Sequence, residues 1–232
     1  MAPDPAARPI IVFDVNETLL DVRALEPLFR RLFGSESVLR EWFAQLILYA
    51  EAVTLAEIYV PFGTIAAGAL RMLADARQVQ VTDQDREELR SRMQALPPHP
   101  EVPGALRRLG RAGFRMVTLT NSTPHSDGGP LERAGIAGCF ERQFSVDAVQ
   151  RYKPAPETYR MVAQALGVAT PALCLVAAHA WDVLGAQRAG CRGVLVTRTG
   201  HAALPIGALP QPDIIGADLE DVAGQMIGRW PA

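Results

Sequence analysis

The chain has 232 residues, 49% hydrophobic and 21% charged, which is enough for one sizeable core or for a core with a smaller domain. Lysine and arginine (23) nearly balance aspartate and glutamate (25), so the net charge is −2. A nearly neutral chain offers no bulk electrostatic attraction for nucleic acid or for an anionic membrane surface. We therefore expect a small-molecule ligand, and neither a nucleic-acid nor a membrane partner.

The cysteines, Cys139, Cys174 and Cys191, are odd in number and lack CxxC spacing, which argues against a disulfide framework and against a zinc site. Three buried thiols in a reducing compartment are expected instead. The N-terminal stretch MAPDPAARP contains no apolar signal core, and the apolar run over 46–60 is interrupted by two glutamates. The sequence therefore predicts a cytoplasmic protein.

The first part of the chain predicts one strand and then a block of helices. The residues 10–13, IIVF, form a short apolar run that is typical of a buried strand. Three runs with apolar residues at helical spacing follow: 25–33, 38–53 and 55–79. Thr82 and Asp85 form the pattern of a capping box, which predicts a helix over 83–95. The proline-rich stretch 97–104, PPHPEVPG, then indicates a domain boundary.

Beyond this boundary the pattern alternates between strands and helices. The predicted strands cover 115–120, 141–146, 173–178, 193–198 and 212–217. The predicted helices cover 103–112, 128–135, 155–167, 182–190 and 219–227, and 201–212 is a predicted surface loop. This alternation is typical of a parallel sheet with helices on both faces. We predict a Rossmann-like, doubly wound α/β core over 8–20 and 99–228, with a helical cap domain inserted over 21–98.

Polar residues follow several of the predicted strands at the point where each strand ends. Asp14, the pair Thr120–Asn121 and His179 occupy such positions, and Lys153 lies in a turn that can reach the same edge. In parallel α/β sheets, ligands bind beyond the carboxyl ends of the strands. The sequence therefore predicts an active site at this edge.

Several of these residues also have a simpler structural interpretation. A lone Asp14 can cap a turn, and Thr18 can cap the same turn or donate a hydrogen bond to the carboxylate. Lys153 alone would be a solvated charge, and Tyr159 and Trp181 alone would be packing residues. If Lys153 shares a site with Asp14, however, it keeps the carboxylate ionised and able to act as a nucleophile.

The segment AAHAWD (177–182) has two interpretations as well. His179 can be an ordinary loop histidine and Asp182 an ordinary helix cap, or the two can orient the water that hydrolyses an ester. Thr120 and Asn121 can start a helix, or their hydroxyl, amide and backbone N–H groups can bind an anion or a leaving group.

The segments FDVNET, TLTNS, YKP and AAHAWD resemble, in order and spacing, the four motifs of the haloacid dehalogenase superfamily. The resemblance extends from Ile10 to about Ile227 and is strongest to the L-2-haloacid dehalogenases of type II, through YKP followed by Tyr159 and through AWDVLGA. It implies hydrolysis of short-chain 2-haloacids to 2-hydroxy acids through an ester on Asp14, with no metal and no cofactor. The resemblance does not decide whether the chain forms a homodimer.

Most members of this superfamily are phosphatases, which carry two further acids where this chain has Asn16 and Ala178. Asn16 cannot protonate a leaving alcohol, and with both acids missing a Mg²⁺ site built from carboxylate oxygens is poorly supplied. Halide needs no proton to leave, and displacement at carbon needs no metal, so the pattern favours dehalogenation. The alternatives are a phosphatase or another hydrolase of the superfamily, and a non-catalytic protein that binds a small molecule.

By this resemblance, Lys153 and Thr18 position the Asp14 carboxylate, and Asp182 with His179 handles the water. The residues expected to contact the substrate are Val15, Asn16, Phe43, Thr120, Asn121, Tyr159 and Trp181. Phe43 stands where the dehalogenases carry an arginine that assists the departing halide. We therefore expect Phe43 to form an apolar wall of the site and His179 to supply compensating positive charge.

Overall fold

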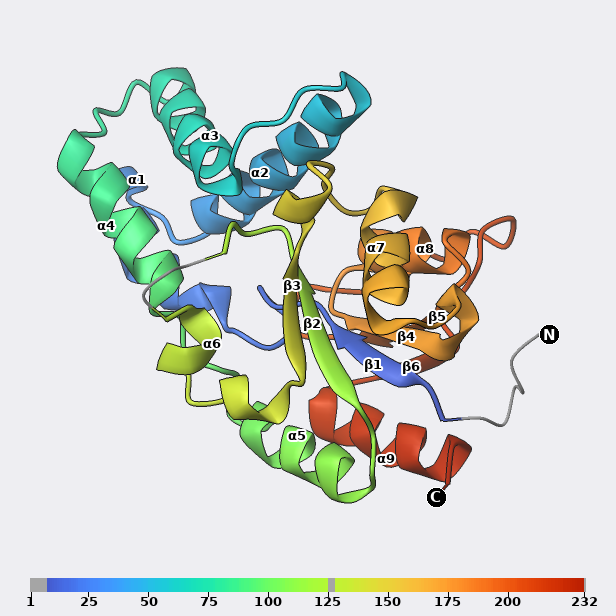
Figure 1. The fold of residues 1–232 in the computed structure, drawn as a ribbon. Helices are drawn as coiled ribbons and strands as arrows, with labels where there is room; N and C mark the ends of the chain where they lie inside the picture. Colours follow the sequence, from blue (N-terminus) through green and yellow to red (C-terminus); the bar gives the residue numbers. More distant parts are fainter. Residues whose placement is uncertain (1–7, 125–127, 232) are drawn as a thin grey trace.

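The computed structural model describes residues 8–124 and 128–231, and its centre is a parallel sheet of six strands in the order β3-β2-β1-β4-β5-β6 (Figure 1). The strands are β1 (Ile10–Phe13), β2 (Met116–Thr120), β3 (Arg142–Ser145), β4 (Leu173–Ala177), β5 (Arg192–Val196) and β6 (Ile214–Gly216). Every neighbouring pair is parallel. The predicted doubly wound α/β fold is confirmed.

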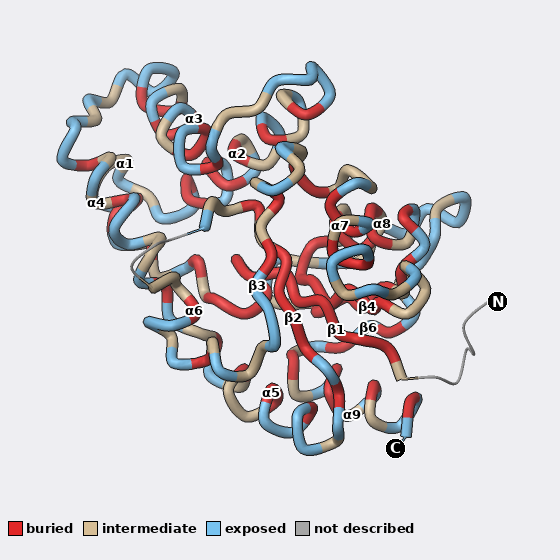
Figure 2. The backbone as a smooth tube through the Cα atoms, viewed as in Figure 1, coloured by how far each residue is buried: buried red, intermediate tan, exposed pale blue. Residues whose placement is uncertain are grey.

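Helices cover both faces of this sheet, which is why its central strands are continuous apolar runs. The helices that follow the insertion are α5 (Val102–Arg111), α6 (Pro130–Arg133), α7 (Pro156–Leu166), α8 (Ala180–Arg188) and α9 (Leu219–Arg229). Figure 1 shows α5 and α9 on one face and α7 and α8 on the other. Buried residues follow the strands and the inward sides of these helices (Figure 2).

The residues between β1 and α5 form a separate group of helices beside the carboxyl edge of the sheet (Figure 1). They are η1 (Val22–Leu25), α1 (Glu26–Phe33), α2 (Val38–Leu55), α3 (Phe62–Ala76) and α4 (Asp83–Gln94). The chain leaves and returns at adjacent points, since Asp21 N donates to Pro97 O at 2.8 Å and Leu20 is bridged to Pro98. The division into a core over 8–20 and 99–228 and a cap over 21–98 stays a prediction.

The start of α4 is the predicted capping box: Asp85 N donates to Thr82 Oγ1 at 3.2 Å, and Thr82 N donates to Asp85 Oδ2 at 2.8 Å. The predicted helix over 55–79 is wrong at its start. Pro61 directly precedes the first turn of α3. Because proline has no N–H to donate, a helix begins after it more readily than it runs through it.

The chain leaves α2 through a left-handed residue, since φ at Glu57 is 58°. The turn that follows separates α2 from α3, so one predicted helical run is in fact a turn and a shorter helix. The predicted helix over 128–135 is also too long. Gly129 precedes α6, and Gly135, with a φ of 69°, follows it, so only Pro130–Arg133 is helical. The other predicted elements after the proline-rich stretch agree with the structure to within two residues at each end.

The cysteines are free, but only Cys174 and Cys191 are buried. The expectation of three buried thiols is wrong for Cys139, because this residue ends a short 3-10 turn on the connection between α6 and β3.

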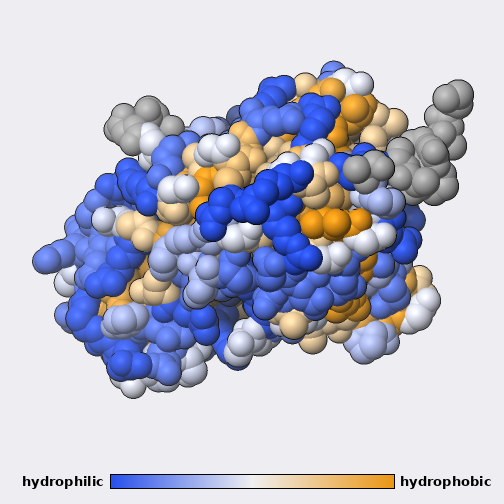
Figure 3. Space-filling view, turned by 90° about the horizontal axis from the view of Figure 1, so that it is seen from below, coloured by the Kyte–Doolittle hydropathy of each residue, from blue (hydrophilic) through white to orange (hydrophobic). Residues whose placement is uncertain are grey.

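No helix within 8–124 and 128–231 combines the length and the apolar character that a membrane crossing requires. The face seen in Figure 3 mixes hydrophilic and hydrophobic side chains.

Candidate active site

The predicted site residues converge on a buried ammonium group. Lys153 Nζ donates to Asp14 Oδ1 at 2.7 Å, to Asp182 Oδ2 at 2.6 Å and to the carbonyl oxygen of Leu119 at 3.2 Å. Asp14 follows β1, Asp182 lies in the first turn of α8, and Lys153 precedes α7. All three side chains are buried, and Lys153 is the only lysine of the sequence. A compact ammonium group can bridge two carboxylates at short range.

The charges of this cluster decide which group is ready to react. Burial alone would raise the pKa of Asp14, but the positive charge of Lys153 and then contacts with His179 lower it below its usual value. Burial raises the pKa of Asp182 in spite of Lys153. For Lys153, the two carboxylates outweigh burial and raise the pKa. At neutral pH, Asp14 is therefore an ionised carboxylate next to a cation, as a nucleophile requires.

Three further predicted residues hold this cluster in place. Thr18 Oγ1 donates to Asp14 Oδ2 at 2.6 Å and accepts from Ala178 N at 2.8 Å, so it links the turn after β1 to the end of β4. Asn121 Oδ1 accepts from Lys153 N at 3.1 Å, and Tyr159 Oη donates to Asp182 Oδ1 at 2.5 Å. Asn121 and Tyr159 thus position Lys153 and Asp182, and their contacts with a substrate stay predictions.

Val15, Asn16 and Thr120, three further residues predicted to contact the substrate, lie close to Asp14. Val15 and Asn16 follow it directly and are buried. Asn16 Nδ2 donates to Ser122 Oγ at 3.5 Å, and Thr120 Oγ1 accepts from Ser122 N at 3.1 Å. These contacts join the ends of β1 and β2 beside the nucleophile. The role of the backbone N–H groups there in binding a substrate carboxylate stays a prediction.

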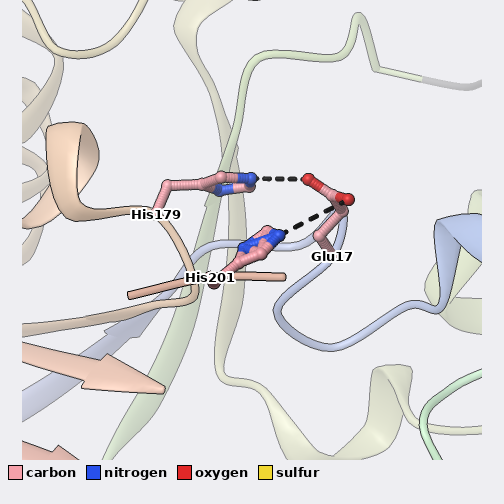
Figure 4. A group of neighbouring side chains, drawn as sticks. All are labelled: Glu17, His179 and His201. Atoms are coloured by element: carbon pink, nitrogen blue, oxygen red, sulfur yellow. Dashed lines mark hydrogen bonds and ion pairs between the residues drawn. The ribbon is translucent and has the colours of Figure 1, made fainter. Parts of the chain in front are cut away.

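His179 reaches the same cluster, and its main partner is a residue that the sequence did not indicate. His179 Nε2 lies 2.7 Å from Glu17 Oε2 (Figure 4). His179 Nδ1 lies 3.6 Å from Asp14 Oδ2. His201 Nε2 lies 3.7 Å from the other oxygen of Glu17. The predicted surface loop therefore begins inside the site, because the side chain of His201 is only 17% exposed.

Phe43 of α2 brings a residue of the helical segment into contact with His179. Its ring stacks on the imidazole of His179, with 5.7 Å between the ring centroids and 14° between the planes. The indole of Trp181 stacks on the same imidazole at 5.1 Å. A cleft of ≈ 1010 Å³ opens beside these rings, and its lining includes Glu17, Phe43 and His201. A small molecule that enters this cleft reaches the aromatic group beside Asp14.

The charge state of His179 depends on the acids around it. Burial alone would lower the pKa of this imidazole, but Asp14 and Glu17 raise it to about 9. The pKa of His201 is lowered by burial and by the neighbouring His179. At neutral pH the site therefore holds a cation at His179 and a neutral imidazole at His201.

Comparison with known proteins agrees with this geometry. The family model of the haloacid dehalogenase-like hydrolases matches residues 9–190. An (S)-2-haloacid dehalogenase of Pseudomonas sp. (strain YL) is 30% identical over 206 residues, covering 88% of this chain and 89% of the relative. The chain belongs to the haloacid dehalogenase-like hydrolases.

One further relative of this haloacid dehalogenase-like hydrolase and one similar solved structure are also dehalogenases by name. Haloacetate dehalogenase H-2 of Moraxella sp. (strain B) is 29% identical, with 86% of this chain and 90% of the relative covered. A crystal structure of an L-2-haloacid dehalogenase superposes with a TM-score of 0.88 at 28% identity, covering 95% of this chain and 99% of that chain. The similarity therefore includes both the helical segment and the sheet.

The Mg²⁺ site of the phosphatases does not fit the residues of this haloacid dehalogenase-like hydrolase. Ala178 offers no side-chain oxygen, and its N–H already donates to Thr18. Asn16 provides an amide in place of a carboxylate. Mg²⁺ binds through oxygen ligands, preferably carboxylates. We therefore derive no catalytic step through this metal.

We expect Lys153→Met to destabilise the fold strongly. The substitution leaves the buried carboxylates Asp14 and Asp182 without their shared cation, and breaking a buried pair in this way costs about 3–5 kcal/mol. Urea unfolding at neutral pH measures the loss. The control is Arg71→Met, which removes an exposed ion pair with Asp75 and should change the free energy of unfolding by less than about 1 kcal/mol. Equal losses for the two variants would contradict the central role of Lys153.

Proposed function

We propose that this chain hydrolyses short-chain 2-haloacids to 2-hydroxy acids in two displacements, through an ester on Asp14. The observation that carries the proposal is the ionised Asp14 between Lys153 and His179, and His179 in turn lines the cleft. The names of its relatives, haloacid and haloacetate dehalogenases that match over most of their length, support the same reaction.

In the first displacement, an oxygen of Asp14 attacks the α-carbon of the haloacid. The carbon–halogen bond breaks and the halide leaves with its electron pair, which gives an ester with inverted configuration. Hydrogen bonds from Lys153 and Thr18 hold the carboxylate in a fixed orientation for this attack. The imidazolium of His179 supplies positive charge close to Phe43, where the resemblance leads us to expect an arginine.

In the second displacement, water attacks the ester carbonyl of Asp14. Ester formation removes the negative charge of Asp14, one of the charges that raise the pKa of His179. The pKa of His179 then falls, so its Nδ1, which faces Asp14, can release its proton and accept one from water. Glu17 holds Nε2 and fixes the ring, as an orienting acid does for a catalytic histidine. The tetrahedral intermediate then collapses: the alkoxide takes the proton back from His179 and leaves as the 2-hydroxy acid, and the second water proton passes to solvent, which restores the Asp14 carboxylate.

This division of roles differs from the expectation that Asp182 shares the activation of water. Both carboxylate oxygens of Asp182 already accept hydrogen bonds, one from Lys153 and one from Tyr159. Its side chain is also fully buried. We therefore propose His179 as the general base and Asp182 as the residue that anchors Lys153.

Halide release from chloroacetate, fluoroacetate and each enantiomer of 2-chloropropionate, with and without EDTA, tests the proposal. We expect chloride release that persists in EDTA, because no step uses a metal. Loss of activity on chelation, with recovery in Mg²⁺ and release of phosphate from a phosphomonoester, would replace the proposal with a phosphatase. Saturable binding of 2-haloacids without release of any halide would instead indicate a binding protein.

A cytoplasmic location and a homodimer are finer proposals. The first rests on the free cysteines and the second on the resemblance to dehalogenases. Sedimentation of the purified chain tests the second, since a homodimer has twice the mass of the 25.1 kDa chain.

A further inference from the structure

Three side chains with metal-binding atoms meet at the cleft, and each comes from a different segment. Glu17 follows β1, His179 precedes the first turn of α8, and His201 lies in the loop after β5 (Figure 4). One nitrogen from each histidine and a carboxylate oxygen all lie within 4.8 Å of one another. The proposed reaction uses Glu17 and His179 but leaves His201 without a role.

The contacts around the two imidazoles point their Nε2 atoms toward Glu17. His201 Nδ1 lies 3.2 Å from the carbonyl oxygen of Ala178. Since a carbonyl can only accept, Nδ1 carries the proton and Nε2 keeps a free lone pair. His179 Nδ1 faces Asp14 Oδ2, so its Nε2 also faces Glu17. Metal-binding histidines are held in this way, with the second ring nitrogen on a carbonyl or a carboxylate.

The spacing of these atoms suits a small tetrahedral ion. Zn²⁺ binds imidazole nitrogen and carboxylate oxygen at about 2.0–2.2 Å, so its tetrahedral ligand atoms lie about 3.3–3.6 Å apart. The two distances from the Glu17 oxygens, 2.7 Å to His179 Nε2 and 3.7 Å to His201 Nε2, lie on either side of that range. Small rotations of these side chains would complete three ligand positions, and the cleft leaves the fourth open to water.

We propose that Glu17, His179 and His201 bind one Zn²⁺ ion, and that this ion inhibits the enzyme. Two imidazoles and one carboxylate are typical ligands of zinc and other first-row transition metals, whereas Mg²⁺ and Ca²⁺ prefer oxygen ligands alone. Zinc displaces the Nε2 proton of the His179 imidazolium to solvent. With zinc on Nε2 and a proton on Nδ1, His179 has no lone pair to accept a proton from water. The inhibition rests on the proposed function, but the binding does not.

Binding is tested first, without any assay of activity. The purified chain is titrated with Zn²⁺ in competition with a chromophoric chelator, and with Co²⁺ to record its visible absorption bands. We expect one ion per chain. His201→Asn, which keeps a donor for the carbonyl of Ala178, should weaken binding by at least about tenfold. The control is His125→Asn, at a histidine outside the described residues, and it should bind as the parent does. If the parent does not bind one ion per chain, or if His201→Asn binds zinc as tightly as the parent, the proposed zinc site is wrong.

Halide release then tests the inhibition. The rate of each variant in EDTA is its own reference, so the effect of zinc is separated from any effect of the substitution on the basal rate. Added Zn²⁺ should inhibit the parent and His125→Asn, but not His201→Asn at the same concentration. If zinc binds the parent at this site without slowing halide release, the inhibition is wrong and His179 is not the base. If halide is released in EDTA but zinc does not bind, only the zinc site is wrong.

Discussion

Asp14→Asn is expected to reduce halide release by at least about a thousandfold, because a neutral amide is a poor nucleophile. The two side chains are nearly the same size, so the fold should remain, although Lys153 then pairs with Asp182 alone. Halide release measures the activity, and circular dichroism checks the fold. The intact mass of the variant must also be checked, since deamidation would restore the aspartate. Activity close to that of the parent in a sample free of deamidation would contradict the mechanism.

Isotope labelling distinguishes a nucleophilic Asp14 from one that acts only as a base. In a single turnover in H₂¹⁸O with excess enzyme, the new hydroxyl oxygen of the product comes from the Asp14 carboxylate. We therefore expect largely unlabelled product and one ¹⁸O on Asp14, measured by mass spectrometry of the peptide that contains it. Label that appears directly in the product would mean that water attacks the substrate itself.

His179→Ala is expected to slow ester hydrolysis by about 10²–10⁴-fold, the usual range for loss of a general base. The enzyme should then release up to one halide per chain, and the protein esterified at Asp14 should accumulate and be visible by intact mass. Glu17→Gln keeps the imidazole but weakens its orientation, so it should accumulate the same ester with a smaller loss of rate. Arg71→Met, which removes only an exposed ion pair with Asp75, is the control and should accumulate none.

The site of the adduct decides the outcome of this experiment. The mechanism requires the added mass on the peptide that contains Asp14, and an adduct on another residue would refute it. If Asp182→Asn accumulates the ester and His179→Ala does not, the roles of the two residues are reversed.

The centre of the site could be predicted from the order of the elements. In a parallel sheet the carboxyl ends of all strands lie at one edge, so residues directly after the strands, such as Asp14 and Asn121, must come close together. Lys153 and Asp182 were predicted on the same basis and through the motif resemblance. The individual hydrogen bonds of the site were harder to predict, because they depend on side-chain rotamers. The hydrogen bond that Asn121 Oδ1 accepts from the backbone N–H of Lys153 is one example.

Glu17 and His201 could not be predicted, because their meeting depends on irregular backbone. Glu17 has a left-handed φ of 64°, which is uncommon for a residue other than glycine and redirects its side chain. His201 lies in a loop that has no hydrophobic period, so its sequence carries no signal of burial. The start of α3 was missed for a related reason, since the apolar pattern continues through the turn after α2.

The stack of Phe43 on His179 has an evolutionary consequence. A guanidinium group in place of the Phe43 ring would lie against an imidazolium, and like charges at this range repel each other and would lower the pKa of His179. An arginine at 43 and the Glu17–His179 pair are therefore competing ways to place positive charge beside the nucleophile. Positions 17, 43 and 179 should covary among homologous chains, so that a lineage which gains the histidine–glutamate pair also gives up the arginine.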